Sequence, residues 1–158
     1  MTALNDILDL SCVEIDVDAS SKKRAIERGS ELIADAHIGV NPRALFEQLM
    51  ARERLGSTGL GDGIAIPHCR SDAVTEIVGG LLRLAQPINF DAPDDDDVDL
   101  IFCLVVPKDA QDMHLKILSR LARIFSEATN RDTLRAAPTA QALFDAFDAM
   151  LRSAGGSD

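Results

Sequence analysis

The side chains best suited to chemistry follow a glycine-rich segment in the middle of the chain. Glycine occupies every second position over Gly59–Gly63, and the apolar run Ile64–Ile66 then predicts a buried strand that Pro67 ends. His68 comes directly after this strand, where an open α/β sheet commonly places reactive groups, and Arg70 is suited to bind phosphate or carboxylate. The pattern indicates an imidazole presented in a cationic, glycine-lined opening. The plain alternative is a core histidine satisfied by a neighbour.

A second histidine follows the most apolar stretch of the chain. Val98–Val106 predicts a central strand, and His114 lies at the beginning of the helix that comes next. If this strand runs parallel to the one before His68, the two imidazoles face each other at the end of the sheet. Such a pair suits a metal site with Asp112 as a further ligand, an acid–base pair, or a nucleophile with a helper. His37 closes another helix and is expected only to complement its dipole.

Other catalytic patterns are weak in this sequence. Gly56–Gly59 does not match the Gly-x-Ser-x-Gly turn of serine hydrolases, and no Gly-Lys-Ser/Thr follows the glycines as in a nucleotide-binding loop. Arg52 and Arg54 lie at the end of a predicted helix. Unless they have a functional role, we expect them to pair with Glu53 or Asp62 in solvent, where an ion pair contributes little.

Composition favours a globular cytoplasmic protein and excludes several partners. Of 158 residues, 46% are hydrophobic, no apolar run could span a membrane, and the N-terminus lacks the pattern of a signal peptide. A net charge of −10 and 4% aromatic residues argue against nucleic acid, which requires clustered cations and stacking side chains. Cys12 and Cys103 lie in apolar runs and are expected to be buried free thiols, whereas Cys69 borders the glycines and is expected to be more accessible.

Hydrophobic periodicity predicts one α/β domain over residues 1–158, a sheet of four or five strands covered by helices. The strands are expected at 12–17, 64–66, 77–84 and 98–106, with a break at Gln86–Pro87. The helices are expected at 22–37, 42–55, 112–128 and 139–151, with shorter turns of helix at 4–10 and 131–137. The apolar stripe over 112–128 consists of Leu115, Leu118, Leu121, Ala122 and Phe125. Asp94–Asp97 predicts an exposed loop, and Gly155–Asp158 a frayed tail.

The segment Arg52–His68 is similar, almost residue for residue, to the signature of a bacterial family. These are the enzyme IIA components of the phosphoenolpyruvate-dependent phosphotransferase system, of the fructose/mannitol type (EIIA type-2). The chain resembles in particular their nitrogen-regulatory branch, IIA-Ntr. The resemblance continues through 87–92, 98–102 and 105–107 and ends in the helix begun by His114, so it covers nearly the whole chain.

This resemblance implies a fold, a site and partners. The fold is the mannitol-type IIA fold, a mixed sheet flanked by helices. His68 is phosphorylated by a histidine of an HPr-like carrier (NPr), itself supplied by a phosphoenolpyruvate-dependent enzyme I. Arg52 stabilises the phosphate and His114 assists without being phosphorylated. Arg70, Gly61 and Gly63 are further expected binding residues, and neither a metal nor another cofactor is required.

Three functions remain open from the sequence. No membrane IIC segment and no IIB domain accompany the chain, which favours regulation of target proteins according to phosphorylation state. The first alternative is a sugar-transport IIA that passes phosphate to a separate fructose- or mannitol-type IIB. The second is a domain that binds a small anion near His68 without covalent change. Asp94–Asp97 departs from the family pattern, and we do not connect this loop with phosphoryl transfer.

Overall fold

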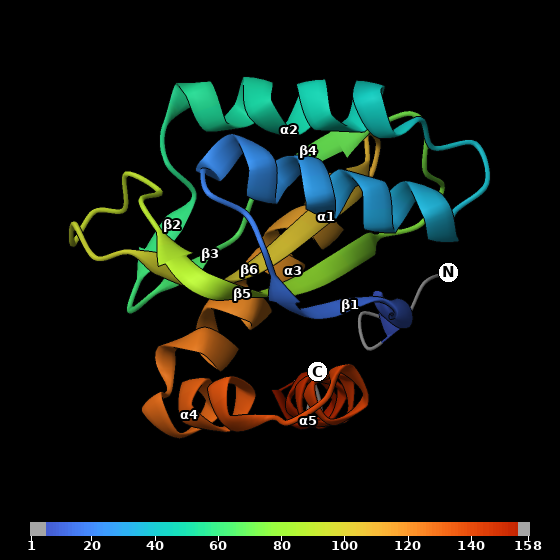
Figure 1. Ribbon diagram of the computed structural model, residues 1–158. Helices are drawn as coiled ribbons and strands as arrows, with labels where there is room; N and C mark the ends of the chain where they lie inside the picture. Colours follow the sequence, from blue (N-terminus) through green and yellow to red (C-terminus); the bar gives the residue numbers. More distant parts are fainter. Residues whose placement is uncertain (1–5, 155–158) are drawn as a thin grey trace.

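The computed structural model describes residues 6–154, which form one mixed sheet with helices on both faces (Figure 1). The strands are β1 (Leu8–Val17), β2 (Gly59–Gly61), β3 (Ile64–Ala65), β4 (His68–Ser71), β5 (Val78–Ile88) and β6 (Val98–Pro107). The helices are α1 (Lys22–Ala36), α2 (Pro42–Leu55), α3 (Gln111–Ser126), α4 (Ala128–Ala136) and α5 (Ala140–Ala154). The predicted α/β architecture is confirmed. The sheet has six strands in place of four or five, because the short segments β2 and β4 also pair.

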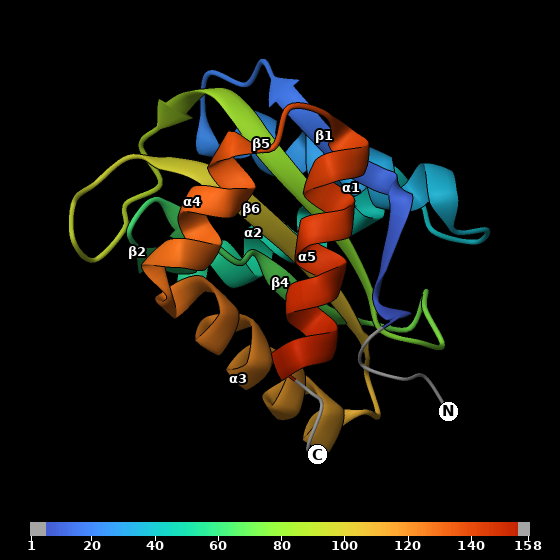
Figure 2. The same ribbon diagram turned by 90° about the horizontal axis from the view of Figure 1, so that it is seen from below.

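The sheet separates two hydrophobic cores. Helices α1 and α2 cover one face, and α3, α4 and α5 cover the other (Figures 1 and 2). Alternate residues of β6 enter the two cores, with Ile101, Cys103 and Val105 packed on the α1/α2 side and Leu100, Phe102, Leu104 and Val106 on the other. Because both faces are covered, β6 is apolar from Leu100 to Pro107, whereas Asp99 near its beginning pairs with Arg135 of α4.

Strand β6 also positions the segment that carries His68. It pairs with β5 in antiparallel fashion and with β3 and β4 in parallel. His68 pairs with Leu104 in the same register in which Ile64 pairs with Leu100. The carbonyl oxygen of Pro67 accepts the N–H of Leu104 at 2.9 Å across the interruption. The sequence predicts that Pro67 ends the strand. In the structure Pro67 only interrupts it, and pairing with β6 resumes at His68 in the same register.

The sequence predicts a helical turn over 4–10, but in the structure residues 8–10 of this range belong to a strand. Strand β1 begins at Leu8, which pairs in parallel with Gly79 of β5. The N–H of Gly79 also donates to the carbonyl oxygen of Ile7 at 2.8 Å, so sheet pairing satisfies this backbone. Residues 4–5 and the predicted tail Gly155–Asp158 lie outside the described residues.

Two further boundaries differ from the prediction. Strand β5 continues through Pro87 to Ile88, and an irregular register between Arg83 and Ile88 removes the proline from the regular ladder of hydrogen bonds. The short turn predicted at 131–137 is a complete helix, α4, which begins at Ala128. None of the helices within residues 6–154 is both long and apolar enough to cross a membrane.

Candidate functional site

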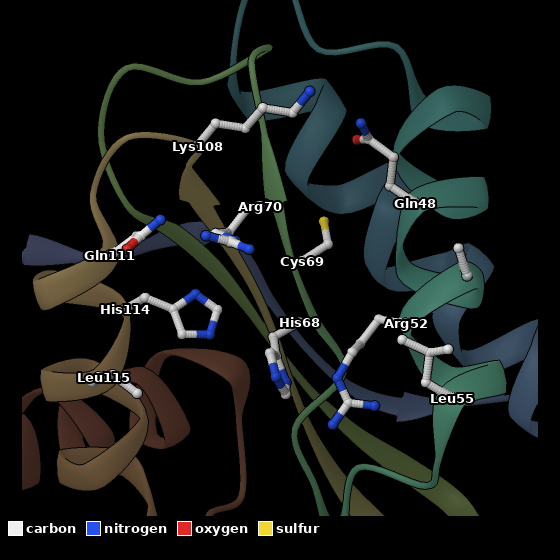
Figure 3. Close-up of a pocket in the computed structure, with 11 residues that line it drawn as sticks. Gln48, Arg52, Leu55, His68, Cys69, Arg70, Lys108, Gln111, His114 and Leu115 are labelled. Carbon is white, nitrogen blue, oxygen red and sulfur yellow. The ribbon is translucent and has the colours of Figure 1, made fainter.

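Three elements bring four of the predicted site residues to one pocket. His68 and Arg70 come from β4, Arg52 from the last turn of α2, and His114 from the first turn of α3. The pocket has a volume of about 830 Å³, and the rings of His68 and His114 point toward one another within it (Figure 3). The parallel pairing of β4 with β6 explains this meeting, because His68 and the helix that follows β6 then lie toward the same end of the sheet.

The local backbone fixes the orientation of the His68 ring. Nδ1 of His68 lies 2.7 Å from the carbonyl oxygen of Ile66, two residues earlier. A carbonyl oxygen only accepts, so this contact requires the proton of a neutral ring on Nδ1. Burial lowers the pKa of His68 below its usual value, with the charge of Arg52 acting in the same direction. The ring is therefore neutral at pH 7, and Nε2 carries the lone pair.

His114 stands beside the ring of His68. The centroids of the two imidazoles are 5.5 Å apart, with an angle of 67° between the ring planes. Burial is the largest cause that lowers the pKa of His114, followed by its interaction with the neighbouring imidazole of His68 and by the charges of Arg70 and Arg52. Its buried Nδ1 has no hydrogen-bond partner among the described residues. His114 is thus a neutral ring, and within residues 6–154 no hydrogen bond to its Nδ1 fixes which of its two nitrogens carries the proton. The ring can hydrogen-bond a group bound at His68.

Arginine side chains supply positive charge around the two rings. Nη1 of Arg52 donates to the carbonyl oxygen of Gly56 at 2.8 Å, which holds the guanidinium at the end of α2. Figure 3 shows Arg52 directed toward His68 from one side and Arg70 lying between His114 and Lys108. Lys108 makes an ion pair with Asp72 at 3.2 Å. Together the cations and neutral imidazoles form a site that suits a multiply charged anion such as phosphate.

Two exposed leucines flank the pocket. The sequence places Leu115 in the buried stripe of its helix, but it is 70% exposed, and Leu55 is 85% exposed. Both line the opening, from α3 and α2 respectively. The buried face of α3 instead uses Ile117, Leu121, Ile124 and Phe125, a stripe rotated away from Leu115. Large apolar side chains that border a polar pocket are typical of a surface that another protein covers.

The structure does not bring Gly61 and Gly63 to this pocket. Both have positive φ, +93° and +81°, and they flank Asp62 in the turn between β2 and β3. A Cβ atom at Gly61 would lie 3.2 Å from a carboxylate oxygen of Asp94, and one at Gly63 would overlap the guanidinium of Arg135. These glycines therefore make room for atoms of this chain, outside the pocket that His68 lines. Asp94–Asp97 is exposed, as predicted.

Cys69 differs from its expected accessibility. It lies beside His68 and contributes to the pocket wall, yet it is only 8% exposed, and burial raises the pKa of its thiol to about 12. The thiolate is thus strongly disfavoured, which argues against a nucleophilic role. Cys12 and Cys103 are buried free thiols, as predicted. Within residues 6–154, no three side chains of His, Cys, Asp or Glu gather as metal ligands would.

Glu53 is the polar residue whose role the sequence reasoning missed. The expectation of a solvent ion pair with the neighbouring arginines is wrong, because Glu53 is only 5% exposed and its carboxylate contacts Thr58 and Lys22. The helical spacing contains a signal for this burial. Glu53 follows Phe46 and Leu49 by seven and four residues, so it continues the buried stripe of α2.

The fold and this site together define an α/β domain with a paired-histidine, arginine-flanked anion pocket. A family model described as "Phosphoenolpyruvate-dependent sugar phosphotransferase system, EIIA 2" matches residues 6–150. The chain belongs to this family. A mannitol IIA from Escherichia coli has the same fold, with a TM-score of 0.70 at 18% identity, covering 92% of this chain and 98% of that one.

Within the family, the nitrogen-regulatory proteins are notably similar to this chain. The "Nitrogen regulatory protein" of Pseudomonas aeruginosa is 43% identical over 144 residues, 91% of this chain and 94% of the relative. The crystal structure of IIA-Ntr from Neisseria meningitidis superimposes with a TM-score of 0.85 at 40% identity, covering 94% of this chain and 98% of that one. A "PTS system fructose-specific EIIA component" from Haloferax volcanii is 34% identical over 145 residues, 92% of this chain and 94% of the relative.

Proposed function

We propose that this protein is a cytoplasmic phosphocarrier that accepts a phosphoryl group on His68. The donor is a phosphohistidine of an HPr-like protein (NPr), which enzyme I supplies from phosphoenolpyruvate, and the phosphorylation state regulates target proteins. The observation that carries the proposal is the orientation of His68. Its Nδ1 is engaged by Ile66, which leaves Nε2 as the nucleophile in a pocket with His114 and Arg52. The similarity to nitrogen-regulatory relatives supports the regulatory part.

In the proposed step, the lone pair on Nε2 of His68 attacks phosphorus, and the N–P bond to the donor imidazole breaks. The donor ring, protonated on its other nitrogen, leaves with the electron pair of that bond and becomes a neutral imidazole. Positive charge that develops on the His68 ring is delocalised to Nδ1–H, whose hydrogen bond to Ile66 then becomes charge-assisted. Phosphoryl transfer of this kind needs mainly in-line positioning and neutralisation of the equatorial oxygens. Arg52, His114 and Arg70 are assigned to those oxygens.

The apolar rim explains how the carrier reaches the site. Leu55 and Leu115 offer exposed apolar surface on opposite sides of His68, and the carrier buries it when it docks. Burial of such side chains contributes most when they lie at the centre of an interface. The docked carrier also excludes water, which would otherwise hydrolyse the phosphohistidine.

A sugar-transport role is the second candidate. The similarity to the fructose-specific EIIA component of Haloferax volcanii supports it. In that case His68 receives the phosphoryl group in the same way and then donates it to a IIB protein. Incubation of the phosphorylated protein with fructose- and mannitol-type IIB proteins distinguishes the two roles, because a regulator retains its phosphate and a transport component loses it.

Intact-mass measurement after incubation with phosphoenolpyruvate, enzyme I and NPr tests the proposal. We expect a gain of one phosphoryl group that is lost in acid, is absent in His68→Ala and persists in His37→Ala. His37 is the matched control because it is the one histidine outside the pocket among the three in the chain. No gain with a carrier shown to be phosphorylated would overturn the proposal and favour the anion-binding alternative.

A further inference from the structure

We infer that Glu53 is a positioning residue that holds the His68 ring in its reactive orientation through Thr58 and the backbone of Ile66. The inference rests on the proposed function for its meaning, since it concerns the nitrogen that accepts the phosphoryl group. It assigns a role to the polar cluster of Glu53, Thr58 and Lys22, which takes no part in the transfer step itself. Glu53 touches neither His68 nor any group bound to it in the contacts described.

Glu53 is the centre of a buried polar cluster that links α1, α2 and the segment before β2. Its carboxylate accepts the backbone N–H of Thr58 at 2.9 Å and the Oγ1–H of Thr58 at 2.6 Å. Nζ of Lys22, in the first turn of α1, lies 3.3 Å from the same carboxylate. Glu53 is 5% exposed and Thr58 is 6% exposed, so water competes little for these hydrogen bonds.

Two backbone contacts continue from this cluster to the reactive ring. The carbonyl oxygen of Thr58 accepts the N–H of Ile66 at 3.0 Å. The carbonyl oxygen of Ile66 in turn accepts Nδ1–H of His68 at 2.7 Å. The carboxylate therefore fixes Thr58, Thr58 fixes the Ile66 residue, and Ile66 selects the tautomer of His68. These contacts bypass the glycine-rich turn between β2 and β3.

Stability alone does not account well for a carboxylate at this position. A buried ion pair loses most of its Coulombic gain to desolvation, so the pairing with Lys22 by itself gives little reason for a carboxylate here. What the carboxylate provides is geometry, because its two oxygens bind two donors of one residue at once. Lys22 is itself held in place, by Asp91 at 3.1 Å and over the ring of Phe90 at 5.0 Å. Contacts therefore hold the cluster on both sides, at Thr58 and at Lys22.

Thr58 is the sharper position for a test, because Glu53 shares its helical turn with Arg52 and a change there would also disturb that arginine. Thr58→Val keeps the shape and removes the hydroxyl donor, whereas Thr58→Ser keeps the donor. Ser30→Ala is the matched control, since it removes another buried hydroxyl, which donates to the carbonyl oxygen of Ile26 at 2.9 Å. Glu53→Gln, which removes the charge, is a second variant of the cluster.

The readouts are the tautomer of His68, from the ¹⁵N shifts of its ring nitrogens, and the single-turnover rate of phosphorylation by saturating phospho-carrier. For Thr58→Val and Glu53→Gln we expect the Nε2–H tautomer to rise at least about twofold and the rate to fall about tenfold. Thr58→Ser should keep both values near those of the wild type. Ser30→Ala should lower the denaturation midpoint and leave the tautomer and the rate unchanged.

An unchanged tautomer in folded Thr58→Val would overturn the inference, whatever the rate. A rate and tautomer that change equally in Ser30→Ala would also overturn it, because a general loss of stability would then be the cause. The tautomer is measured without any phosphoryl donor. A wild-type protein that accepts no phosphate therefore contradicts the proposed function alone, while the NMR comparison still decides whether Glu53 and Thr58 position the ring.

Discussion

The imidazole rings of His68 and His114 meet edge to face, with their centroids 5.5 Å apart. One ring stands on β4 and the other on α3, so their spacing depends on the packing of β4 and α3 against β6. His68 has one nitrogen committed to Ile66, whereas the buried Nδ1 of His114 has no partner among the described residues. The two rings therefore have different roles, and each difference has a measurable consequence.

We predict that the phosphoryl group is attached to Nε2 of His68. Nδ1 donates to Ile66 and has no free lone pair in this tautomer. The ¹⁵N–³¹P couplings of the phosphorylated, ¹⁵N-labelled protein identify the bonded nitrogen. A phosphoryl group on Nδ1 would contradict the prediction and show that the contact with Ile66 breaks before transfer.

Replacement of His114 by alanine is expected to slow phosphorylation without abolishing it. In the proposed function His114 donates one hydrogen bond to the phosphate, and loss of a donor of this kind costs about a hundredfold to a thousandfold in rate. Its buried Nδ1 has no partner to lose, so the denaturation midpoint should change little. Rapid-quench measurement of the single-turnover rate checks this. Complete loss of phosphorylation in a folded His114→Ala protein would instead make His114 an essential acceptor.

Arg52 and Arg54 provide a matched pair on one helical turn. Arg52 lines the pocket and is held by Gly56, whereas Arg54 is exposed and lies outside the pocket wall. We expect Arg52→Ala to lower the phosphorylation rate about tenfold or more, because it removes a cation beside the equatorial oxygens. Arg54→Ala removes the same charge from the same helix and should leave the rate within about twofold. Equal effects in the two variants would indicate only a general electrostatic attraction of the carrier.

Stability should fall as the pH is lowered from 7 toward 5. Burial lowers the pKa of both His68 and His114 in the folded state below the unfolded value of about 6.5. Over this range the unfolded chain therefore binds protons that the folded chain does not, and stability decreases with decreasing pH. The decrease begins near the unfolded pKa and ends below the folded ones. Urea denaturation at pH 7.5 and 5.5 measures it, and the double variant His68→Gln/His114→Gln should show a smaller difference. An equal difference in the double variant would assign the effect to other groups.

The exposed leucines at the pocket should matter for docking and not for folding. Leu115→Ser is expected to raise the carrier concentration needed for half-maximal rate about tenfold, with the rate at saturation unchanged. Ile38, fully exposed in the loop between α1 and α2, is a control of the same kind away from the pocket. Ile38→Ser should leave both parameters unchanged. If the two variants behave alike in steady-state measurements, Leu115 is not part of the docking surface.

Much of this protein is determined locally by its sequence. The segment Val98–Val106 is recognisable as the central strand, because a strand covered on both faces needs a nearly continuous run of apolar residues, here Leu100–Val106. The helical periods before Gly39 and Gly56 likewise predict α1 and α2. His68, Arg52, Arg70 and His114, which line one pocket in the structure, are identifiable as candidate site residues from their types, positions and family resemblance. These signals depend on neighbours within a few residues, and such neighbours are visible in the chain itself.

The tertiary structure decided what depends on partners distant in sequence. Residues 8–10 are in a strand because Leu8 pairs with Gly79 of β5. Strand propensity alone does not reveal that pairing. Gly61 and Gly63 make room for Asp94 and Arg135, which lie more than thirty residues away in the sequence. Leu115 is exposed because α3 packs into the core through another face, which consists of Ile117, Leu121, Ile124 and Phe125.

Contacts between residues of different elements also decide the interior of the site. The sequence presents Glu53 as one charge among several arginines, but only the packed structure places its carboxylate on Thr58 and connects it to the His68 ring. Sequence determined which side chains are available for the proposed phosphoryl transfer. The meeting of α2, β4 and α3 determined which of them face one another, because distances between elements are fixed by packing and not by position along the chain.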